Sequence, residues 1–91
     1  VSKNKNNLGI ALCGSGAGMS IALNRFKNIR AGLATNHKMA QAQKQQDNIN
    51  VLVIPSDFVN QKIAYLMIDK FLKTKFLKKQ RYLRRIKKLD Q

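Results

Sequence analysis

Residues 8–20 read LGIALCGSGAGMS, and this stretch decides the fold that the sequence predicts. A short apolar run ends at Cys13, the single cysteine of the chain. Glycines then stand at alternate positions, at Gly14, Gly16 and Gly18, before the pattern of a helix begins. The order strand, glycine-rich turn and helix brings backbone N–H groups and a helix N-terminus to one point, which suits a phosphate or an oxyanion.

The length and composition indicate a single small globular domain. The chain has 91 residues, of which 44% are hydrophobic, and it lies near the low end of the sizes that bury an adequate core. No apolar run approaches the ~20 residues of a membrane span, and no secretion signal is recognised, so we expect a cytoplasmic protein with no membrane contact. One cysteine and one histidine exclude an internal disulfide and are too few for a structural zinc site, so we predict no metal.

The charge is strongly positive, at +14, because 18 Lys and Arg face only four acidic residues. One interpretation is binding to nucleic acid, anionic lipid or a phosphorylated small molecule. The other, which we favour, is a general compositional bias that spreads lysine over solvated surfaces. The chain contains no Glu, so proton transfer would fall to Cys13, His37 or an aspartate. The aspartates are Asp47, Asp57, Asp69 and Asp90.

Hydrophobic periodicity predicts strands that alternate with helices. Apolar runs place the strands at residues 8–13, 29–35 and 51–54. The first two helices are expected at residues 19–26 and 36–46, the second capped by Thr35 or Asn36. A third helix, capped by the segment Pro55-Ser56-Asp57, presents apolar residues at helical spacing from Val59 to Phe71. A basic helix from about residue 78 to residue 89 follows.

This alternation predicts an α/β domain with a parallel sheet and right-handed crossovers. Residues 1–7 are expected to form a disordered arm, residues 8–77 the α/β core and residues 78–91 the C-terminal helix. Three strands are few for a sheet that is covered on both faces. We therefore expect an incomplete three-layer sheet, whose N-terminal strands are absent here or whose core is completed by another chain.

The glycine-rich turn does not match the common nucleotide-binding motifs. A P-loop needs a Lys followed by Ser or Thr, whereas Gly18 is followed by Met19 and Ser20. The dinucleotide fingerprint needs a third glycine where Met19 stands and an acidic residue about twenty positions later, where none is found. A turn that holds a monophosphate or an enediolate oxygen requires only amides and small side chains, and this interpretation fits better.

Several side chains near the predicted turns have both a structural and a chemical interpretation. Cys13 is either a small buried residue at a strand end or a thiolate stabilised by the glycine turn. Ser15 could relay a proton, bind a hydroxyl or cap the helix. His37, at a predicted helix start, favours capping over catalysis. Arg81 and Arg85 share a helix face at i, i+4, so they either hold a phosphate or form a solvated basic face.

The stretch LGIALCGSGAGMSIALNRFKNIRAGLAT resembles the ribose-5-phosphate isomerase B and galactose-6-phosphate isomerase family. The hallmark of that family is a CGTG-x-G-[MI]-S-I-A-x-N-K stretch followed by G-I-R-A. Near the C-terminus, QRYLRRI is similar to the family pattern G-R-H-x-R-R-[IV]. The resemblance extends from Leu8 to about Lys88 and is most specific at residues 13–24 and 29–31.

This resemblance implies a Rossmann-like α/β fold and a homodimer with sites at the subunit interface. It implies an aldose–ketose isomerase that acts on a phosphorylated sugar without metal or cofactor. Cys13 would move a proton between C1 and C2 of the sugar, and Arg81 and Arg85 would hold its phosphate across subunits. Backbone amides of the turn would bind the enediolate and the substrate hydroxyls, namely those of Gly14, Ser15, Gly16, Ala17 and Gly18.

The chain also departs from the family pattern. The ring-opening histidine of the family falls on Gln46, and glutamine cannot donate and recover a proton as imidazole does. The neighbouring substrate-binding asparagine falls on Asp47, although a slip of one position would give Asn48. A cationic ligand position carries Asp57. The first strands of the family, with their Asp-His pair, lie upstream of Leu8.

Three functions follow from these observations. The first is a sugar-phosphate isomerase that interconverts ribose 5-phosphate and ribulose 5-phosphate, preferred over the galactose 6-phosphate equivalent because of the R-x-x-R-R tail. The second is a degenerate, non-catalytic relative that binds a phosphosugar or a partner subunit, which Gln46 and Asp57 favour. The third is a nucleic-acid-binding module using residues 70–88. This segment lacks interleaved surface aromatics and any known docking motif, so nucleic acid is the least favoured partner.

Overall fold

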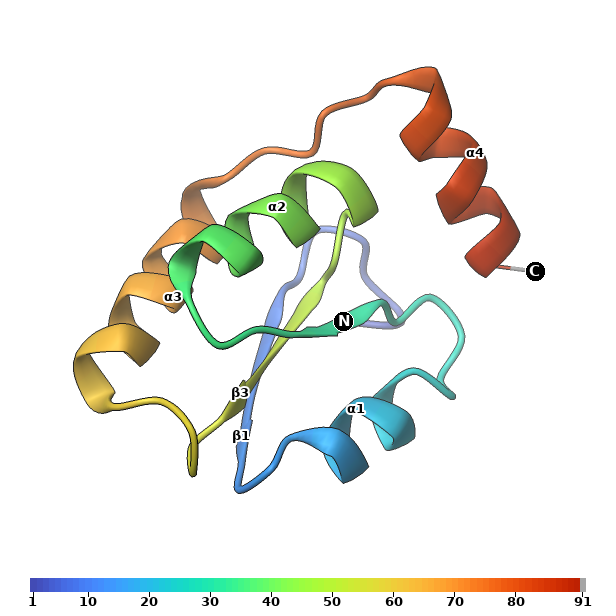
Figure 1. The fold of residues 1–91 in the computed structure, drawn as a ribbon. Helices are drawn as coiled ribbons and strands as arrows, with labels where there is room; N and C mark the ends of the chain where they lie inside the picture. Colours follow the sequence, from blue (N-terminus) through green and yellow to red (C-terminus); the bar gives the residue numbers. More distant parts are fainter. Residues whose placement is uncertain (91) are drawn as a thin grey trace.

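The computed structural model describes residues 1–90, which fold into three strands and four helices (Figure 1). In chain order the elements are β1 (Gly9–Cys13), α1 (Ala17–Leu23), β2 (Ala31–Leu33), α2 (His37–Asp47), β3 (Val51–Pro55), α3 (Gln61–Lys73) and α4 (Gln80–Leu89). The predicted alternation of strands and helices is confirmed.

The strands form one parallel sheet in the order β1-β3-β2. Cys13 pairs with Pro55 in the β1–β3 register, and Leu33 pairs with Val53 in the β2–β3 register. β3 is therefore the central strand, and all five of its residues are buried. The parallel sheet expected from the sequence is confirmed.

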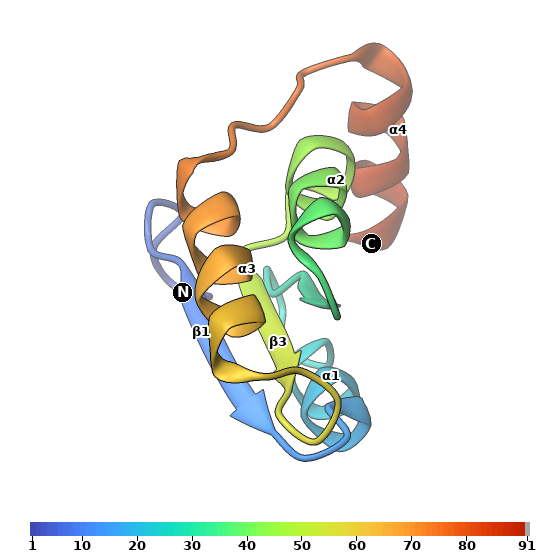
Figure 2. The same ribbon diagram turned by 60° about the vertical axis from the view of Figure 1, so that its left-hand side comes forward.

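The helices lie in layers on the two faces of this sheet. Leu52 and Ile54 of β3 point to the face covered by α2 and α3, where they pack against Met67 and Phe71. α1 covers the opposite face, against β2 and β3 (Figure 2). The apolar residues of α3 recur at helical spacing and so face the core. They include Phe71, the largest fully buried side chain among residues 1–90.

α1 begins and ends earlier than residues 19–26, where the sequence predicts it. Gly16 has a left-handed backbone, with φ of 81°, and precedes the first helical residue, Ala17. At the other end, the side chain of Asn24 makes hydrogen bonds of 2.7 and 3.0 Å with the backbone of Ala31. These bonds draw the chain out of the helix and toward β2.

α2 begins where the sequence predicts. Asn36, one of the two predicted caps, accepts a hydrogen bond at Oδ1 from the backbone N–H of Met39 at 2.9 Å. His37 is the first residue of the helix, so the capping role expected for it is wrong. Asn48 ends the helix in the left-handed region, with φ of 48°.

The start of α3 differs from the prediction. Asn60 caps this helix, because its Oδ1 accepts a hydrogen bond from the backbone N–H of Ile63 at 2.9 Å. The cap predicted at Ser56 and Asp57 is wrong, since their backbone N–H groups donate to the turn that follows β1. Ser56 and Asp57, which the local pattern assigns to the start of the helix, therefore form tertiary hydrogen bonds in its place.

β2 has three residues, fewer than the predicted strand 29–35, because a polar network holds the residues before it. The side chain of Asn50 accepts from the backbone N–H of Arg30 at 2.7 Å, and Arg30 Nε donates to the carbonyl oxygen of Asn48 at 2.9 Å. The Arg30 guanidinium also lies 3.5 Å from a carboxylate oxygen of Asp90. This network joins the starts of β2 and β3 to the end of α4.

The two ends of the chain lie outside the sheet. Residues 1–7 contain no helix or strand, and Asn28 Nδ2 donates to the carbonyl oxygen of Ser2 at 3.5 Å. α4 begins two residues later than predicted, packs beside α2 and buries Tyr82. Gln91, the last residue of the predicted segment 78–91, lies outside the described residues.

Lys44, on α2, is a buried cation without a carboxylate partner among residues 1–90. Its ammonium nitrogen lies 5.2 Å from the ring centre of Phe71. Burial, and then the positive charge of Arg30, lower the pKa of Lys44. Because the unfolded chain holds this proton more tightly, the free energy of unfolding rises with pH between the lowered pKa and the ordinary value of 10.5.

We expect Lys44→Met to raise the melting temperature at pH 7 by a few degrees, because it removes a buried charge and keeps an apolar chain of similar length. The pH dependence of stability above neutrality should also become flatter. Thermal unfolding followed by circular dichroism between pH 7 and pH 10 measures both effects. Lys38→Met, on the exposed side of the same helix, removes the same charge, and an equal gain in that variant would contradict the prediction.

Candidate active site

The predicted catalytic turn lies at the carboxyl edge of the sheet, where β1 and β3 end (Figure 1). The backbone N–H of Ser56 donates to the carbonyl oxygen of Cys13 at 2.8 Å, and its hydroxyl donates to the same oxygen at 3.2 Å. The backbone N–H of Asp57 donates to the carbonyl oxygen of Gly14 at 3.0 Å. The turn after β3 therefore fixes the turn after β1.

The same turn has backbone donors that are free to bind a ligand. The carbonyl oxygens of Cys13 and Gly14 are occupied, but no acceptor among residues 1–90 is found for the backbone N–H groups of Gly14, Ser15 and Gly16. Ser15 Oγ accepts a long bond of 3.4 Å from the backbone N–H of Ala17. Consecutive free amides of this kind form a site for negative charge.

Cys13 stands at the start of this turn. Its thiol is free and half-buried, and its position in the strand directs it to the face of the sheet that carries α1, with Ala11 and Pro55. A half-buried thiol at the carboxyl end of a strand is reachable by a small ligand. The location of the residue is thus compatible with the chemical role predicted for it, and the role itself stays a prediction.

The shape of the turn requires glycine at one position. Gly16 is buried and has φ of 81°, and a Cβ there would clash with Cδ1 of Leu33 and lie 3.4 Å from Cβ of Pro55. Gly18, in the first turn of α1, has no such constraint, because a Cβ there would meet nothing within 4 Å. The two glycines therefore have different roles, although the sequence spaces them identically.

Asp57 places a carboxylate beside the turn. A Cβ at Gly14 would lie 2.8 Å from Oδ2 of Asp57, so the two turns touch at this point. Asp69 pairs with Lys73 at 2.8 Å, and Asp90 pairs with Arg30. Asp57, by contrast, has no ion pair among the described residues. An uncompensated negative charge therefore stands next to donors that suit anions.

The other predicted site residues lie away from Cys13 within one chain. Gln46 and Asp47 end α2, at the amino edge of the sheet. Arg81 and Arg85 are on α4, which both views place far from the start of α1 (Figures 1 and 2). The structure thus brings together the turn 13–18 and Asp57 but does not bring the arginines to them.

Arg81 has a local partner that the sequence did not indicate. Its guanidinium donates to the hydroxyl oxygen of Tyr82 at 3.1 Å and lies 4.9 Å from the centre of that ring. The hydrogen bond from Arg81 lowers the pKa of Tyr82. Arg85 is exposed on the same helix. The sequence feature that could have indicated this contact is that Tyr82 directly follows Arg81.

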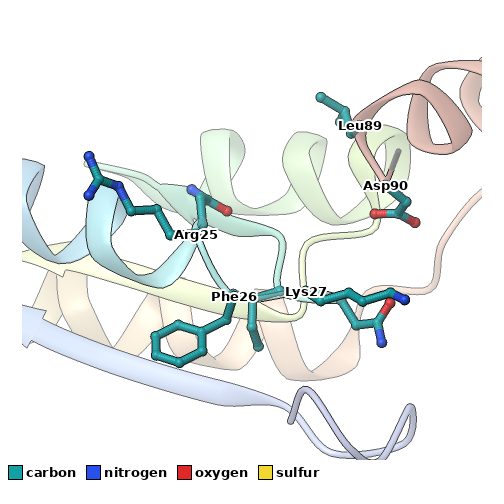
Figure 3. Close-up of a pocket in the computed structure, with 8 residues that line it drawn as sticks. Arg25, Phe26, Lys27, Leu89 and Asp90 are labelled. Carbon is teal, nitrogen blue, oxygen red and sulfur yellow. The ribbon is translucent and has the colours of Figure 1, made fainter.

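A separate hollow lies at the amino edge of the sheet (Figure 3). It has a volume of about 380 Å³ and is formed by the segment 24–29 and by Leu89 and Asp90 from the end of α4. Figure 3 shows the side chains of Arg25 and Lys27 pointing in different directions, so they do not converge on one ligand. The hollow is at the opposite edge from Cys13 and does not belong to the predicted site.

Two further properties concern residues 1–90 only. In that range no three His, Cys, Asp or Glu side chains gather as a metal would require. No helix within it is long and apolar enough to pass through a bilayer.

The fold and the turn define a class of protein. Open parallel α/β sheets bind their ligands at the carboxyl ends of the strands, and here that edge holds a thiol and free amides. The model of the family described as Ribose/Galactose Isomerase matches residues 1–89. The chain belongs to this family.

Individual relatives agree with this assignment. The probable ribose-5-phosphate isomerase B of Mycoplasma genitalium is 40% identical over 90 residues, which are 98% of this chain. A crystal structure of ribose-5-phosphate isomerase B from that organism, with bound ribulose-5-phosphate, superimposes with a TM-score of 0.93 over 99% of this chain. The enzyme from Thermotoga maritima gives a TM-score of 0.91 at 41% identity over 97% of this chain.

The match covers only part of these proteins. The chain spans 59% of the length of the curated Mycoplasma genitalium relative, 59% of the chain in the Mycoplasma genitalium structure and 60% of the Thermotoga maritima chain. The Rossmann-like fold expected from the resemblance is confirmed by these structures. The match therefore assigns the family to this chain, and not the activity of the longer proteins.

The two glycines provide a test of the turn. We expect Gly16→Ala to destabilise the chain by about 2 kcal/mol or more, because it combines a left-handed backbone with a clash against Leu33. Gly18→Ala should be neutral or stabilise by about 0.5 kcal/mol, since it adds a helix-favouring residue in open space. Urea unfolding of both variants measures the difference, and equal effects would contradict the described turn.

Proposed function

We propose that this chain carries the Cys13 part of the active site of a sugar-phosphate aldose–ketose isomerase. The observation that carries the proposal is the half-buried thiol beside the free amides of Gly14, Ser15 and Gly16. Membership of the Ribose/Galactose Isomerase family supports it. The preferred reaction is the interconversion of ribose 5-phosphate and ribulose 5-phosphate, in the cytoplasm and without cofactor.

In the proposed mechanism Cys13 is the base. Its thiolate takes the proton from C2 of the open-chain aldose, and the electron pair of that C–H bond becomes the second bond between C1 and C2. The carbonyl oxygen at C1 takes up the negative charge, so an enediolate forms. The C2 hydroxyl then passes its proton to the oxygen at C1, directly or through Ser15 Oγ, while the thiol returns the first proton to C1. C2 becomes the carbonyl carbon and C1 carries a neutral hydroxyl, so the ketose results. A single group thus moves the proton both ways.

The turn would stabilise the intermediate. Donors that are already fixed cost no reorganisation when the enediolate charge develops. The amides of Gly14, Ser15 and Gly16 are held in place because Ser56 and Asp57 occupy the carbonyl oxygens of the turn. The amides of Ala17 and Gly18, at the first turn of α1, would bind substrate hydroxyls, and Ser15 Oγ would hold a hydroxyl or relay a proton.

The phosphate would be held by a second subunit. Arg81 and Arg85 are exposed on α4 and lie far from Cys13 in their own chain, so they can approach a catalytic turn only in a neighbouring molecule. The same applies to Gln46 and Asp47, at the end of α2. We therefore propose a homodimer, or a pairing with a related subunit, in which each chain supplies a turn and a set of cations.

Nucleic-acid binding is not supported by the basic helix. Base stacking on single strands needs exposed aromatic rings, whereas the aromatic residue of α4, Tyr82, is buried and holds Arg81.

Substitution of the thiol tests the proposed reaction. We expect Cys13→Ala to lower kcat by at least about 100-fold, because a general base typically contributes that much or more. Binding of ribulose 5-phosphate, measured by calorimetry, should change little, since the amides remain. Cys13→Ser keeps the shape but offers a much weaker base, so it should be equally inactive. Ketose formation is measured for the chain alone and mixed with the segment of the Mycoplasma genitalium relative that it does not match.

The same assay decides between catalysis and a degenerate relative. Wild-type and Cys13→Ala chains that bind the phosphosugar but are equally inactive in both conditions would favour a non-catalytic phosphosugar-binding relative. Gln46 favours that alternative, because the family resemblance places a proton-transferring histidine there and glutamine cannot replace it. Unchanged activity in Cys13→Ala would contradict the mechanism.

Asp57 is expected to weaken phosphosugar binding. A carboxylate within about 8 Å of a phosphate repels it by several tenths of a kcal/mol at the dielectric constant of water, and more at a partly buried site. We expect Asp57→Asn to lower the Kd for ribulose 5-phosphate by about two- to tenfold, and the gain should shrink as salt screens the charge.

The matched control is Asp69→Asn, which changes the net charge equally but lies on α3, paired with Lys73. Calorimetric titrations of both variants at low and at physiological ionic strength make the comparison. If the two variants gain affinity equally, total charge is the cause and the local role of Asp57 is wrong.

A further inference from the structure

β2 is an edge strand, and side chains bond to the backbone groups on its outer side. Within residues 1–90 the sheet order gives β2 one neighbouring strand, β3. The carbonyl oxygen of Arg30 and the N–H of Ala34 bond to β3. Backbone groups of alternate residues point to opposite sides of a strand, so those of Ala31 and Leu33 point outward. These outward groups are the ones with which a further strand would pair.

Asn24, at the end of α1, occupies both outward groups of Ala31. Its Oδ1 accepts a hydrogen bond from the Ala31 N–H at 2.7 Å, and its Nδ2 donates to the Ala31 carbonyl oxygen at 3.0 Å. A side-chain amide has one acceptor oxygen and two N–H donors, so it can make the contacts that the backbone of a neighbouring strand would make. The amide of Asn24 thus takes the place of a strand beside Ala31.

Gln43, on α2, reaches the same edge from the other face of the sheet. Its Nε2 donates to the carbonyl oxygen of Leu33 at 2.9 Å. The side chain lies against Gly32, where any Cβ would clash with Gln43 Oε1. That Oε1 is buried without a hydrogen-bond partner among residues 1–90, and leaving such an acceptor unpaired is costly. The bond to Leu33 is therefore the polar contact that holds this amide at the edge.

The two side chains occupy most of the outward groups of β2. Three of the four, the N–H and C=O of Ala31 and the C=O of Leu33, have side-chain partners. The N–H of Leu33 has no acceptor among residues 1–90. Along β1, by contrast, no side chain in this range bonds to the backbone of Ile10 or Leu12. The closed edge is thus a specific property of β2.

We propose that Asn24 and Gln43 end the sheet at β2 and prevent a second copy of this chain from adding a strand there. An exposed edge strand is a template for pairing between molecules, and natural sheets block it with charges, proline or a covering segment. β2 has the sequence Ala-Gly-Leu, which contains neither a charge nor a proline, so the two amides supply the block. This proposal concerns association and is independent of the proposed function.

Hydrogen exchange of the wild-type chain, followed by NMR, tests the closed edge directly. We expect the protection factor of the Ala31 N–H to be at least about tenfold higher than that of the Leu33 N–H, because only the first has an acceptor. Asn24→Ala should lower the protection factor of Ala31 by about tenfold or more. Equal protection of the two amides in the wild-type chain would overturn the proposal.

Sedimentation velocity of the double variant Asn24→Ala/Gln43→Ala, over a range of chain concentrations, tests the effect on association. We expect its average mass to rise to roughly twice that of the wild-type chain at the same high concentration, because the opened edge pairs with a second copy. Adding Ala31→Pro should abolish this gain, since proline lacks the outward N–H and is tolerated at a sheet edge.

The matched control is Asn50→Ala/Gln45→Ala, which removes the same two residue types. Asn50 also makes two side-chain bonds to the backbone, both of 2.7 Å, but its partners are Arg30 and Asn28, before the outer edge of β2 begins. Circular dichroism checks that each variant folds. If the control associates as strongly as the first double variant, loss of stability is the cause and the proposal is wrong.

Two other outcomes would also overturn the proposal. One is a variant with both edge amides removed that associates no more than the wild-type chain. The other is association that persists after Ala31→Pro is added. Should that variant not fold, the hydrogen exchange of the wild-type chain still decides, because it requires no substitution.

Discussion

The pairing of β1 with β3 is the constraint on which the rest of the structure depends. β3 is buried along its whole length and hydrogen-bonds to both neighbours. Its register with β1 sets Cys13 opposite Pro55, so the two turns that follow are side by side. Ser56 and Asp57 then bind the carbonyl oxygens of the first turn. The consequence is chemical, because a turn whose carbonyl oxygens are already bonded offers its N–H groups to a ligand.

The groups predicted to form the site lie at two ends of the molecule. The carboxyl edge of the sheet has the thiol, the amides and the unpaired carboxylate of Asp57. The arginines predicted to hold a phosphate are on α4, beside α2. Under the proposed function an anionic substrate would need both ends, and one chain does not join them. The +14 charge is therefore not gathered at a single site, and in the proposed pairing the partner subunit would decide which cations reach the turn.

Local sequence patterns predicted the elements better than their boundaries. The apolar run 51–54 and the stretch around Cys13 correctly indicated two strands and a glycine turn. A buried strand requires apolar residues, and a tight turn requires glycine, so both features can be recognised in the sequence. The cap predicted at Ser56 and Asp57 was wrong, because these two residues form tertiary hydrogen bonds with the chain at Cys13 and Gly14 and lie before the start of the helix. Likewise, no local pattern shows that Asn24 bonds to Ala31.

Only the site residues that directly follow a strand could be placed from the sequence, because the order of the strands alone determines their position. Residues that directly follow a strand share an edge, which is why the turn after Cys13 was found from sequence. Arg81 lies on a helix after the last strand, and its distance from the turn depends on how α4 packs beside α2. The turn, in contrast, is held by Ser56 and Asp57, which directly follow β3, and by the packing of Gly16 against Leu33. Its geometry is thus set within this chain. Under the proposed function, binding by the amides and proton transfer by a complete site would therefore be separable properties.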